Sequence, residues 1–294
     1  MIKEVEKWRD EMDAYRMHGL SEIFARPKPI IGMVHLPPLP GSVGYTGYGM
    51  QQIIDFAVRD AQRLVEGGVD GVMVENMWDL PFSVGTNVSP EQMCAQAVAA
   101  REVIHAVKVP VGINVVHNGG RVVLSIAIAA GARFVRVCLL TGAQIWDTGE
   151  FDHGCAHEIL TTRKLAHAEN IKLFCDVDKK HSVRFPGIDL ETHIEWTEFY
   201  LADALIISGK MTGSAPSVEK VKFARKKANP KRPILMGSGT NADNVADFLQ
   251  YADGCIVGFS IKEDPRPENA VSVEKVRHYM AAVESVRKTL KEKP

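Results

Sequence analysis

The sequence has no excess of charge of either sign. Its 294 residues include 35 Lys and Arg against 36 Asp and Glu, which leaves a formal net charge of −1. A chain this close to neutral lacks the general field that draws proteins to nucleic acid or to anionic lipid. We therefore expect a small-molecule partner and no nucleic-acid partner.

Long apolar runs are also absent. The longest stretch, around residues 122–130, is interrupted by Ser125 and is too short to cross a bilayer. Residues 1–26 are rich in Lys, Glu and Arg and contain no apolar core of a signal peptide. We expect a cytoplasmic protein without an integral membrane segment.

Cysteines are few, and no two of them form a C-x-x-C pair. There are five, an odd number, and Cys138, Cys175 and Cys255 fall in apolar runs. Disulfide frameworks and zinc cages need paired spacings, so we expect buried, reduced thiols. The P-loop and the G-x-S-x-G elbow are missing as well, which argues against a Walker NTPase and an α/β-hydrolase.

The sequence does contain a regular alternation of short apolar runs with longer segments of helical spacing. Eight runs, each followed by a helical segment, predict an α/β fold whose parallel sheet closes as a (βα)8 TIM barrel. The alternative is a doubly wound open sheet. Ser89, followed by Pro90 and Gln92, has the pattern of a helix start, and Ser272 precedes a similar one. The runs are 30–34, 71–74, 111–116, 134–140, 171–177, 204–207, 233–236 and 255–257.

We expect a single barrel domain over residues 28–294 and an added N-terminal helix over residues 1–27. Trp8, Met12 and Tyr15 lie on one side of that helix. This apolar side would plug the bottom of the barrel or contact another subunit. We also expect a homo-oligomer.

The connections differ in length at the two ends of the predicted barrel. Those that lead from helix to strand are tight, whereas those that lead from strand to helix are long, polar and rich in glycine. The long loops gather at the carboxyl ends of the strands, the face that holds the active site in such barrels. They are predicted at 76–88, 141–154, 178–188 and 259–271.

Glycine turns follow the last three apolar runs. Glycine lets backbone N–H groups approach an anion closely, and a helix that begins after the turn adds a partial positive charge. Phosphate is commonly bound after the seventh and eighth strands of such barrels. We therefore expect a small phosphorylated substrate, bound by Gly237, Ser238 and Gly239, by Gly258 and Ser260, and by Ser208 and Gly209.

Ionisable residues stand at the ends of the other runs. Glu75 and Asp176 form the candidate acid/base pair, because burying a carboxylate is costly unless it is paired or needed. Lys179, Lys180 or Arg136 would keep one of them ionised or neutralise an enediolate, and His35 would donate to a substrate oxygen. Asn76, Asn114 and Asp178 complete the candidate substrate-binding set. The alternative is a structural network of ion pairs.

No metal site is indicated by a diagnostic spacing. Asp176, Asp178 and His181 offer ligands to Mg²⁺ or another divalent metal, and His153 and His157 would share one face of a helix. Without an H-E-x-x-H motif, a cofactor is not required by the sequence.

The segment 29–41, PIIGMVHLPPLPG, resembles the start of the BtpA/SgcQ family. GVMVEN at 71–76 with Pro81 and Phe82 resembles the same family, as do GIN at 112–114, FCDV at 174–177, and Ile207-Ser208-Gly209 with Thr212-Gly213. The resemblance covers the chain from residue 28 onward. It implies a ribulose-phosphate-binding barrel, and it assigns no catalytic residues.

Three functions stay open. The resemblance implies a factor for photosystem I accumulation in one branch and an association with sugar uptake in another. The density of ionisable residues at the barrel mouth favours an enzyme acting on a phosphorylated sugar, as an isomerase, epimerase or aldolase. The alternatives are a non-catalytic assembly or regulatory factor and a nucleoside- or nucleotide-directed enzyme, because the fold alone does not determine function.

Overall fold

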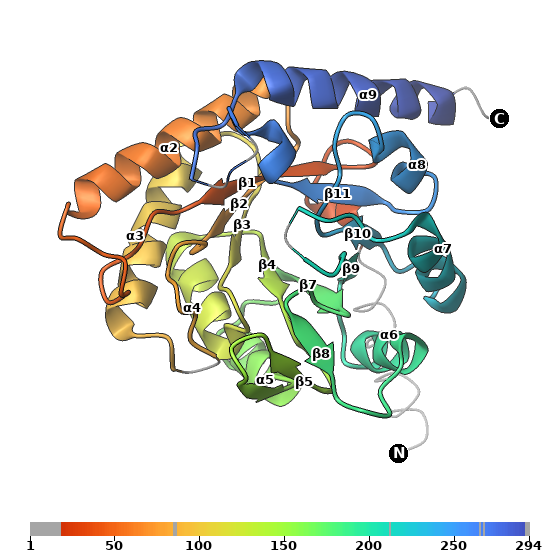
Figure 1. The fold of residues 1–294 in the computed structure, drawn as a ribbon, viewed down its shortest axis with the longest axis horizontal. Helices are drawn as coiled ribbons and strands as arrows, with labels where there is room; N and C mark the ends of the chain where they lie inside the picture. The colour runs from red at the N-terminus through yellow and green to blue at the C-terminus, as the bar shows by residue number, and fades with distance from the viewer. Residues whose placement is uncertain (1–18, 85–86, 212, 265, 267, 292–294) are drawn as a thin grey trace.

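The computed structural model describes residues 19–84, 87–211, 213–264, 266 and 268–291. Eight parallel strands close into a barrel, with each strand hydrogen-bonded to the next one along the chain (Figure 1). The predicted (βα)8 barrel is therefore confirmed. The barrel strands are β1 (Ile30–His35), β2 (Gly71–Glu75), β3 (Val111–Asn114), β4 (Phe134–Val137), β7 (Lys172–Val177), β9 (Ala204–Ile207), β10 (Ile234–Met236) and β11 (Gly254–Val257).

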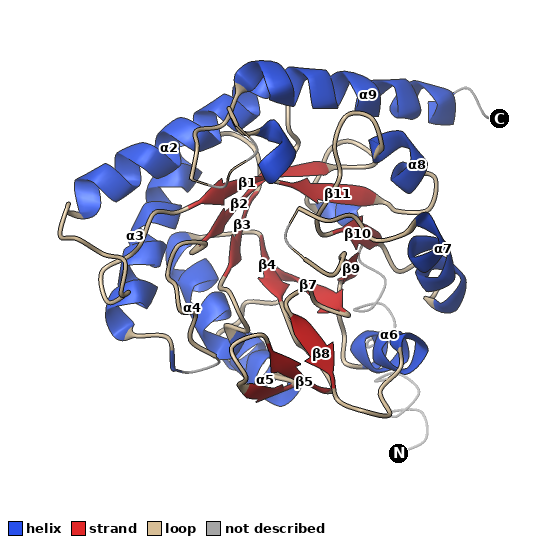
Figure 2. Ribbon diagram, in the orientation of Figure 1, coloured by secondary structure: helices blue, strands red, loops and turns tan. Residues whose placement is uncertain are grey.

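Helices surround the barrel (Figure 2). Ser89 accepts a hydrogen bond from the Gln92 N–H and donates its own N–H to the Gln92 side chain, so the predicted capping box is present. Ser272 caps its helix by accepting from the Lys275 N–H. The helices are α2 (Met50–Gly67), α3 (Pro90–Ala106), α4 (Gly120–Ala130), α5 (Ala156–Leu165), α6 (Leu190–Phe199), α7 (Val218–Lys227), α8 (Val245–Leu249) and α9 (Val273–Lys291), with short 3-10 turns η1 (Leu20–Glu22) and η3 (Phe259–Ile261).

Apolar side chains form two cores, because successive residues of a strand point to opposite faces of the sheet. The larger core lies between the sheet and the helices. The smaller one fills the barrel and includes Met73, Phe134 and Phe174. The rings of Phe134 and Phe174 stack with their centroids 4.9 Å apart. This filled interior confines any ligand to the ends of the barrel.

Phe24, which follows η1, belongs to the inner core and packs on Phe134 with ring centroids 5.7 Å apart. The chain just before β1 therefore helps to fill the barrel. The predicted N-terminal helix with Trp8, Met12 and Tyr15 lies outside the described residues.

A small antiparallel sheet lies in two segments that the sequence predicts as loops. β5 (Ala143–Trp146) and β6 (Phe151–His153) follow β4, and β8 (Ser182–Arg184) follows β7; β5 pairs with both of the others. Their three or four residues are too few for a recognisable alternation of apolar and polar positions. The sheet builds up one side of the barrel mouth.

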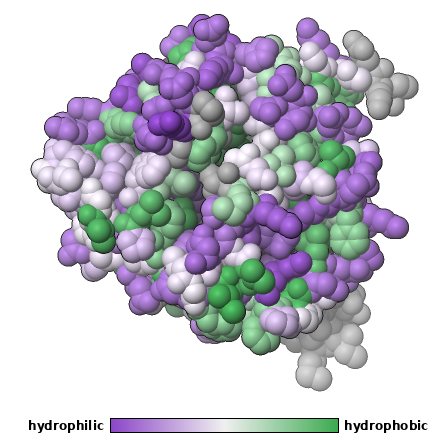
Figure 3. All heavy atoms as spheres, viewed as in Figure 1, coloured by the Kyte–Doolittle hydropathy of each residue, from purple (hydrophilic) through white to green (hydrophobic). Residues whose placement is uncertain are grey.

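All five cysteines are free thiols. Four of them are buried, as expected, whereas Cys94 is exposed. Of the helices in the described part of the chain, none is both long and apolar enough to cross a membrane. Hydrophilic side chains predominate on the face shown in Figure 3, with hydrophobic residues in smaller groups.

Candidate active site

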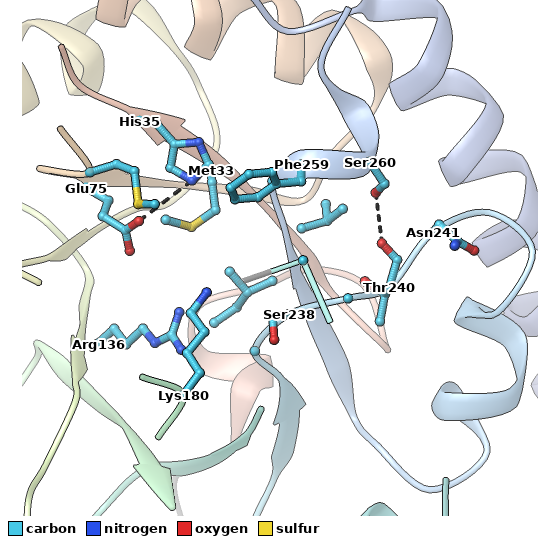
Figure 4. Close-up of a pocket in the computed structure, with 17 residues that line it drawn as sticks. Met33, His35, Glu75, Arg136, Lys180, Ser238, Thr240, Asn241, Phe259 and Ser260 are labelled. Atoms are coloured by element: carbon cyan, nitrogen blue, oxygen red, sulfur yellow. Dashed lines mark hydrogen bonds and ion pairs between the residues drawn. The ribbon is translucent and has the colours of Figure 1, made fainter. Parts of the chain in front are cut away.

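A cavity of about 420 Å³ lies at the carboxyl ends of the barrel strands. His35 and Glu75 face it from one side, Arg136 and Lys180 from a second, and the turns after β10 and β11 from a third (Figure 4). Eight of the predicted site residues line it: His35, Glu75, Arg136, Gly237, Ser238, Gly239, Gly258 and Ser260.

The turn after β10 needs glycine at two positions. Gly239 has φ +77°, a conformation that disfavours side chains, and a Cβ there would lie 2.0 Å from the backbone nitrogen of Ala215. A Cβ on Gly237 would lie 2.4 Å from Ser208 Oγ and 3.2 Å from an Arg136 nitrogen. The turn therefore packs tightly against the neighbouring loop and brings its backbone close to the Arg136 guanidinium.

Backbone donors in these turns are available to a ligand. Among the described residues, the N–H groups of Gly239 and Thr240 have no acceptor. Phe259 and Ser260 open η3, so their N–H groups have no acceptor within that turn. The Ser260 hydroxyl donates to the Thr240 carbonyl at 2.8 Å and ties the two turns together.

The expectation that a helix beginning after the glycine turn that follows β10 adds its positive end to the phosphate site is wrong. The helix after β10, α8, has only five residues and begins at Val245, beyond the glycine turn. An anion here would be held by backbone N–H groups and by Arg136 and Lys180, rather than by the dipole of a long helix.

Glu75 ends β2 next to His35, its partner in the register with β1. It accepts a hydrogen bond from the Asn114 amide, and its other oxygen lies 3.7 Å from His35 Nε2. Burial would raise the pKa of Glu75, but His35 and the cations Lys180 and Arg136 outweigh burial and lower it. Burial lowers the pKa of His35 to about 4, so the imidazole is neutral at pH 7. The carboxylate is thus ionised and available to accept a proton.

The Lys180 side chain extends into this cavity beside Arg136 (Figure 4). Burial and the nearby charges of Lys179 and Arg136 lower its pKa to about 7, while Glu75 opposes that shift. Of the residues that the structure describes, none places a carboxylate within 4.0 Å of its ammonium. The sequence offered Lys179, Lys180 and Arg136 together and had no signal to separate them.

Asp176 lies beneath the cavity and not in its wall. Both of its oxygens accept hydrogen bonds of 2.8 Å from Arg136, and Lys179 Nζ is 3.5 Å away. Burial would raise the pKa of Asp176, but Arg136 and Lys179 lower it. Ser208 donates to the same carboxylate at 3.2 Å. This arrangement makes Asp176 the residue that positions Arg136.

The remaining predicted residues lie outside the cavity. Asn114 donates to Glu75 from the neighbouring strand β3, and Gly209 donates its N–H to Ser238 Oγ at 3.4 Å. Asn76 donates a hydrogen bond to Asp79 and accepts one from the Val116 N–H. Asp178 forms ion pairs with Arg184 and Lys220. The sequence did not single out five other residues that line the cavity: Met33, Met77, Thr240, Asn241 and Phe259. The last three belong to the two glycine turns that were predicted to bind phosphate.

No cluster of three His, Cys, Asp or Glu side chains suited to a metal occurs in the described residues. Asp176 and Asp178 are engaged by different cations, and His181 pairs with Asp147 at 2.9 Å. The expectation that His153 and His157 share a helix face is wrong, because His153 ends strand β6 while His157 lies in α5.

A model of the BtpA family matches residues 26–285. The chain belongs to the BtpA family. An uncharacterized protein of Thermococcus kodakarensis is 42% identical over 89% of this chain and 97% of its own length. The photosystem I biogenesis protein BtpA of Synechocystis is 36% identical over 94% of this chain and 93% of its own length. The resemblance seen in the sequence is therefore confirmed.

Two solved structures share the barrel of this BtpA-family chain. Thiamine phosphate pyrophosphorylase from Pyrococcus furiosus has a TM-score of 0.55, covering 88% of this chain and 96% of that one. Phosphoribosyl anthranilate isomerase from Thermus thermophilus has a TM-score of 0.53, covering 88% and 99%. Both are 14% identical to this chain, so the likeness concerns the fold alone.

Proposed function

We propose that this BtpA-family protein is an enzyme that acts on a phosphorylated sugar or a related metabolite. The observation that carries the proposal is the single cavity shared by the two glycine turns, by Arg136 and Lys180, and by the ionised carboxylate of Glu75. The turns and the cations suit a phosphate group. The barrel neighbours named for phosphorylated compounds support the same class of ligand.

Glu75 is the general base in this proposal. Its carboxylate takes a proton from a substrate carbon next to a carbonyl group. The electron pair of the broken C–H bond forms a C=C bond to the carbonyl carbon, and the π pair of the C=O bond moves onto the oxygen. Arg136 and Lys180 stabilise the negative charge that develops there. Return of the proton to the same or the adjacent carbon gives epimerisation or isomerisation.

Exchange of substrate hydrogen for solvent deuterium tests this step without knowledge of the product. Sugar phosphates are incubated with the protein in D₂O, with and without Mg²⁺, and followed by NMR. We expect at least one to exchange, and Glu75→Gln to slow the exchange by roughly 10²–10⁴-fold while binding persists. The control is Glu66→Gln, an exposed carboxylate paired with Arg277 on the outer surface.

The second candidate is a non-catalytic assembly factor, favoured by the 36% identity to the photosystem I biogenesis protein of Synechocystis. It predicts that Glu75→Gln complements the loss of the wild-type gene in cells. The proposal that the protein is an enzyme would be contradicted if no compound exchanged hydrogen for deuterium and the Glu75→Gln variant complemented fully.

A further inference from the structure

A second cavity of about 480 Å³ adjoins the one described above. Four residues line both cavities: Glu75, Met77, Lys180 and Phe259. The candidate base and the lysine therefore stand at the boundary between them. The rest of the second wall comes from the loops after β2, β3 and β7 and from β5 with the turn that follows it. It comprises Leu80, Pro81, Phe82, Val116, His117, Trp146, Asp147, Thr148, Lys179 and His181.

Flat rings form the core of this wall. His117 stacks on Trp146 with the ring centroids 4.1 Å apart and the planes 5° from parallel, and Phe82 packs on His117 at 5.1 Å. Burial lowers the pKa of His117 to about 4, so its ring carries no charge at neutral pH. Leu80 and Pro81 extend the apolar surface. The second cavity thus differs in chemistry from the first, which is lined by glycine turns and charges.

This wall also contains one buried nitrogen without a protein partner and one half-exposed carboxylate. The buried Nδ1 of His117 has no hydrogen-bond partner within the described residues. The Asp147 carboxylate pairs with His181 at 2.9 Å and lies 3.9 Å from His117 Nε2, and half of its side chain is exposed. A ligand in this cavity meets an aromatic wall that also offers sites for a few hydrogen bonds, which suits a heteroaromatic ring.

We infer that the second cavity binds a planar heteroaromatic ring carried by the same substrate whose phosphate occupies the first cavity. The inference rests on the proposed function and narrows its substrate class to a phosphorylated sugar that carries both a carbonyl group and such a ring. A nucleoside 5′-monophosphate has the phosphate and the ring but no carbonyl group in its sugar, so it serves as a binding probe and not as a substrate. A sugar phosphate alone fills only the first cavity. With phosphate at the glycine turns and the ring against Phe82, the sugar lies at the boundary beside Glu75 and Lys180.

Isothermal titration with three probes tests the inference: ribose 5-phosphate, uridine 5′-monophosphate and uridine. We expect the nucleotide to bind at least roughly tenfold more tightly than ribose 5-phosphate, because ring stacking adds to the phosphate contacts. Phe82→Ala should remove most of that gain and leave the affinity for ribose 5-phosphate within about twofold. The matched control is Phe151→Ala, a half-exposed ring on β6 that lines neither cavity.

The outcomes separate the two proposals. Equal affinity for the nucleotide and ribose 5-phosphate, or a Phe82→Ala variant that keeps the full preference, would overturn the ring site and leave the phosphate site standing. Failure of both phosphorylated probes to bind would instead overturn the proposed function. Equal binding of uridine and its monophosphate would support the ring site and contradict the phosphate site.

Discussion

Arg136 on β4 holds the Asp176 carboxylate on the neighbouring strand β7 by two hydrogen bonds of 2.8 Å, and both side chains are almost completely buried. The pair fixes the guanidinium at the floor of the active-site cavity. Asp176→Asn removes the negative charge and leaves Arg136 buried without its counterion. We expect a loss of about 3–5 kcal/mol in the free energy of unfolding, measured by urea denaturation.

The double variant Arg136→Met/Asp176→Leu controls for packing. Replacing both charges with apolar side chains of similar volume is often close to neutral. This variant should therefore recover part of the stability that the single variant loses, although Lys179 still loses its carboxylate neighbour. A single variant as stable as the wild type would contradict the role given to this pair.

The Lys180 amine should titrate near pH 7, because burial and the charges of Lys179 and Arg136 lower its pKa to about 7. It is protonated below that pH and nucleophilic above it. Trace labelling with acetic anhydride from pH 5 to 10, read by peptide mass spectrometry, gives the midpoint. Lys222, whose pKa is raised by its hydrogen bond to Glu219, serves as the control and should react only at higher pH.

Glu75 should move that midpoint in a defined direction. The carboxylate favours the protonated amine, so Glu75→Gln should lower the Lys180 midpoint to below about 7. An unchanged or raised midpoint would show that Glu75 and Lys180 do not share the cavity as described.

Gly239→Ala should cost at least about 2 kcal/mol of stability and abolish phosphate binding. The positive φ strains any side chain, and the added methyl group would meet the Ala215 backbone. Gly149→Ala is the matched control, since Gly149 also has a positive φ, +86°, but nothing lies within 4 Å of its Cβ position. It should lose only about 1 kcal/mol and bind phosphate normally. If the two variants changed phosphate binding equally, the turn after β10 would not be part of the phosphate site.

Two ion pairs of the same length test the effect of burial. Lys262 Nζ lies 2.9 Å from Asp60 with both side chains fully buried, whereas Arg277 and Glu66 lie 2.9 Å apart with both well exposed. Lys262→Met should lose about 3–5 kcal/mol and Arg277→Met less than about 1 kcal/mol in chemical denaturation. Similar losses would contradict the burial of the first pair.

The barrel was predictable because each of its strands is a short apolar run followed by a segment of helical spacing. The site was predictable only as a group of residues at the strand ends. Glu75 and Asp176 look alike in the sequence, each near the end of a buried strand. Only the position of Arg136 separates the base that lines the cavity from the counterion that does not. Likewise, Lys179 and Lys180 are neighbours in the chain, but Lys179 lies 3.5 Å from Asp176 whereas Lys180 lines the cavity. The small sheet was missed because pairing between β5 and β8 joins segments 38 residues apart, as in the bond from Ser182 to Gln144.

The most direct test of the account is a crystal structure with bound ribose 5-phosphate. We expect its phosphate within hydrogen-bond distance of the backbone N–H groups of Gly239 and Thr240, with Lys180 beside it and the sugar next to Glu75. A phosphate bound away from these turns, or a cavity left empty at ligand concentrations that saturate the protein in solution, would contradict it.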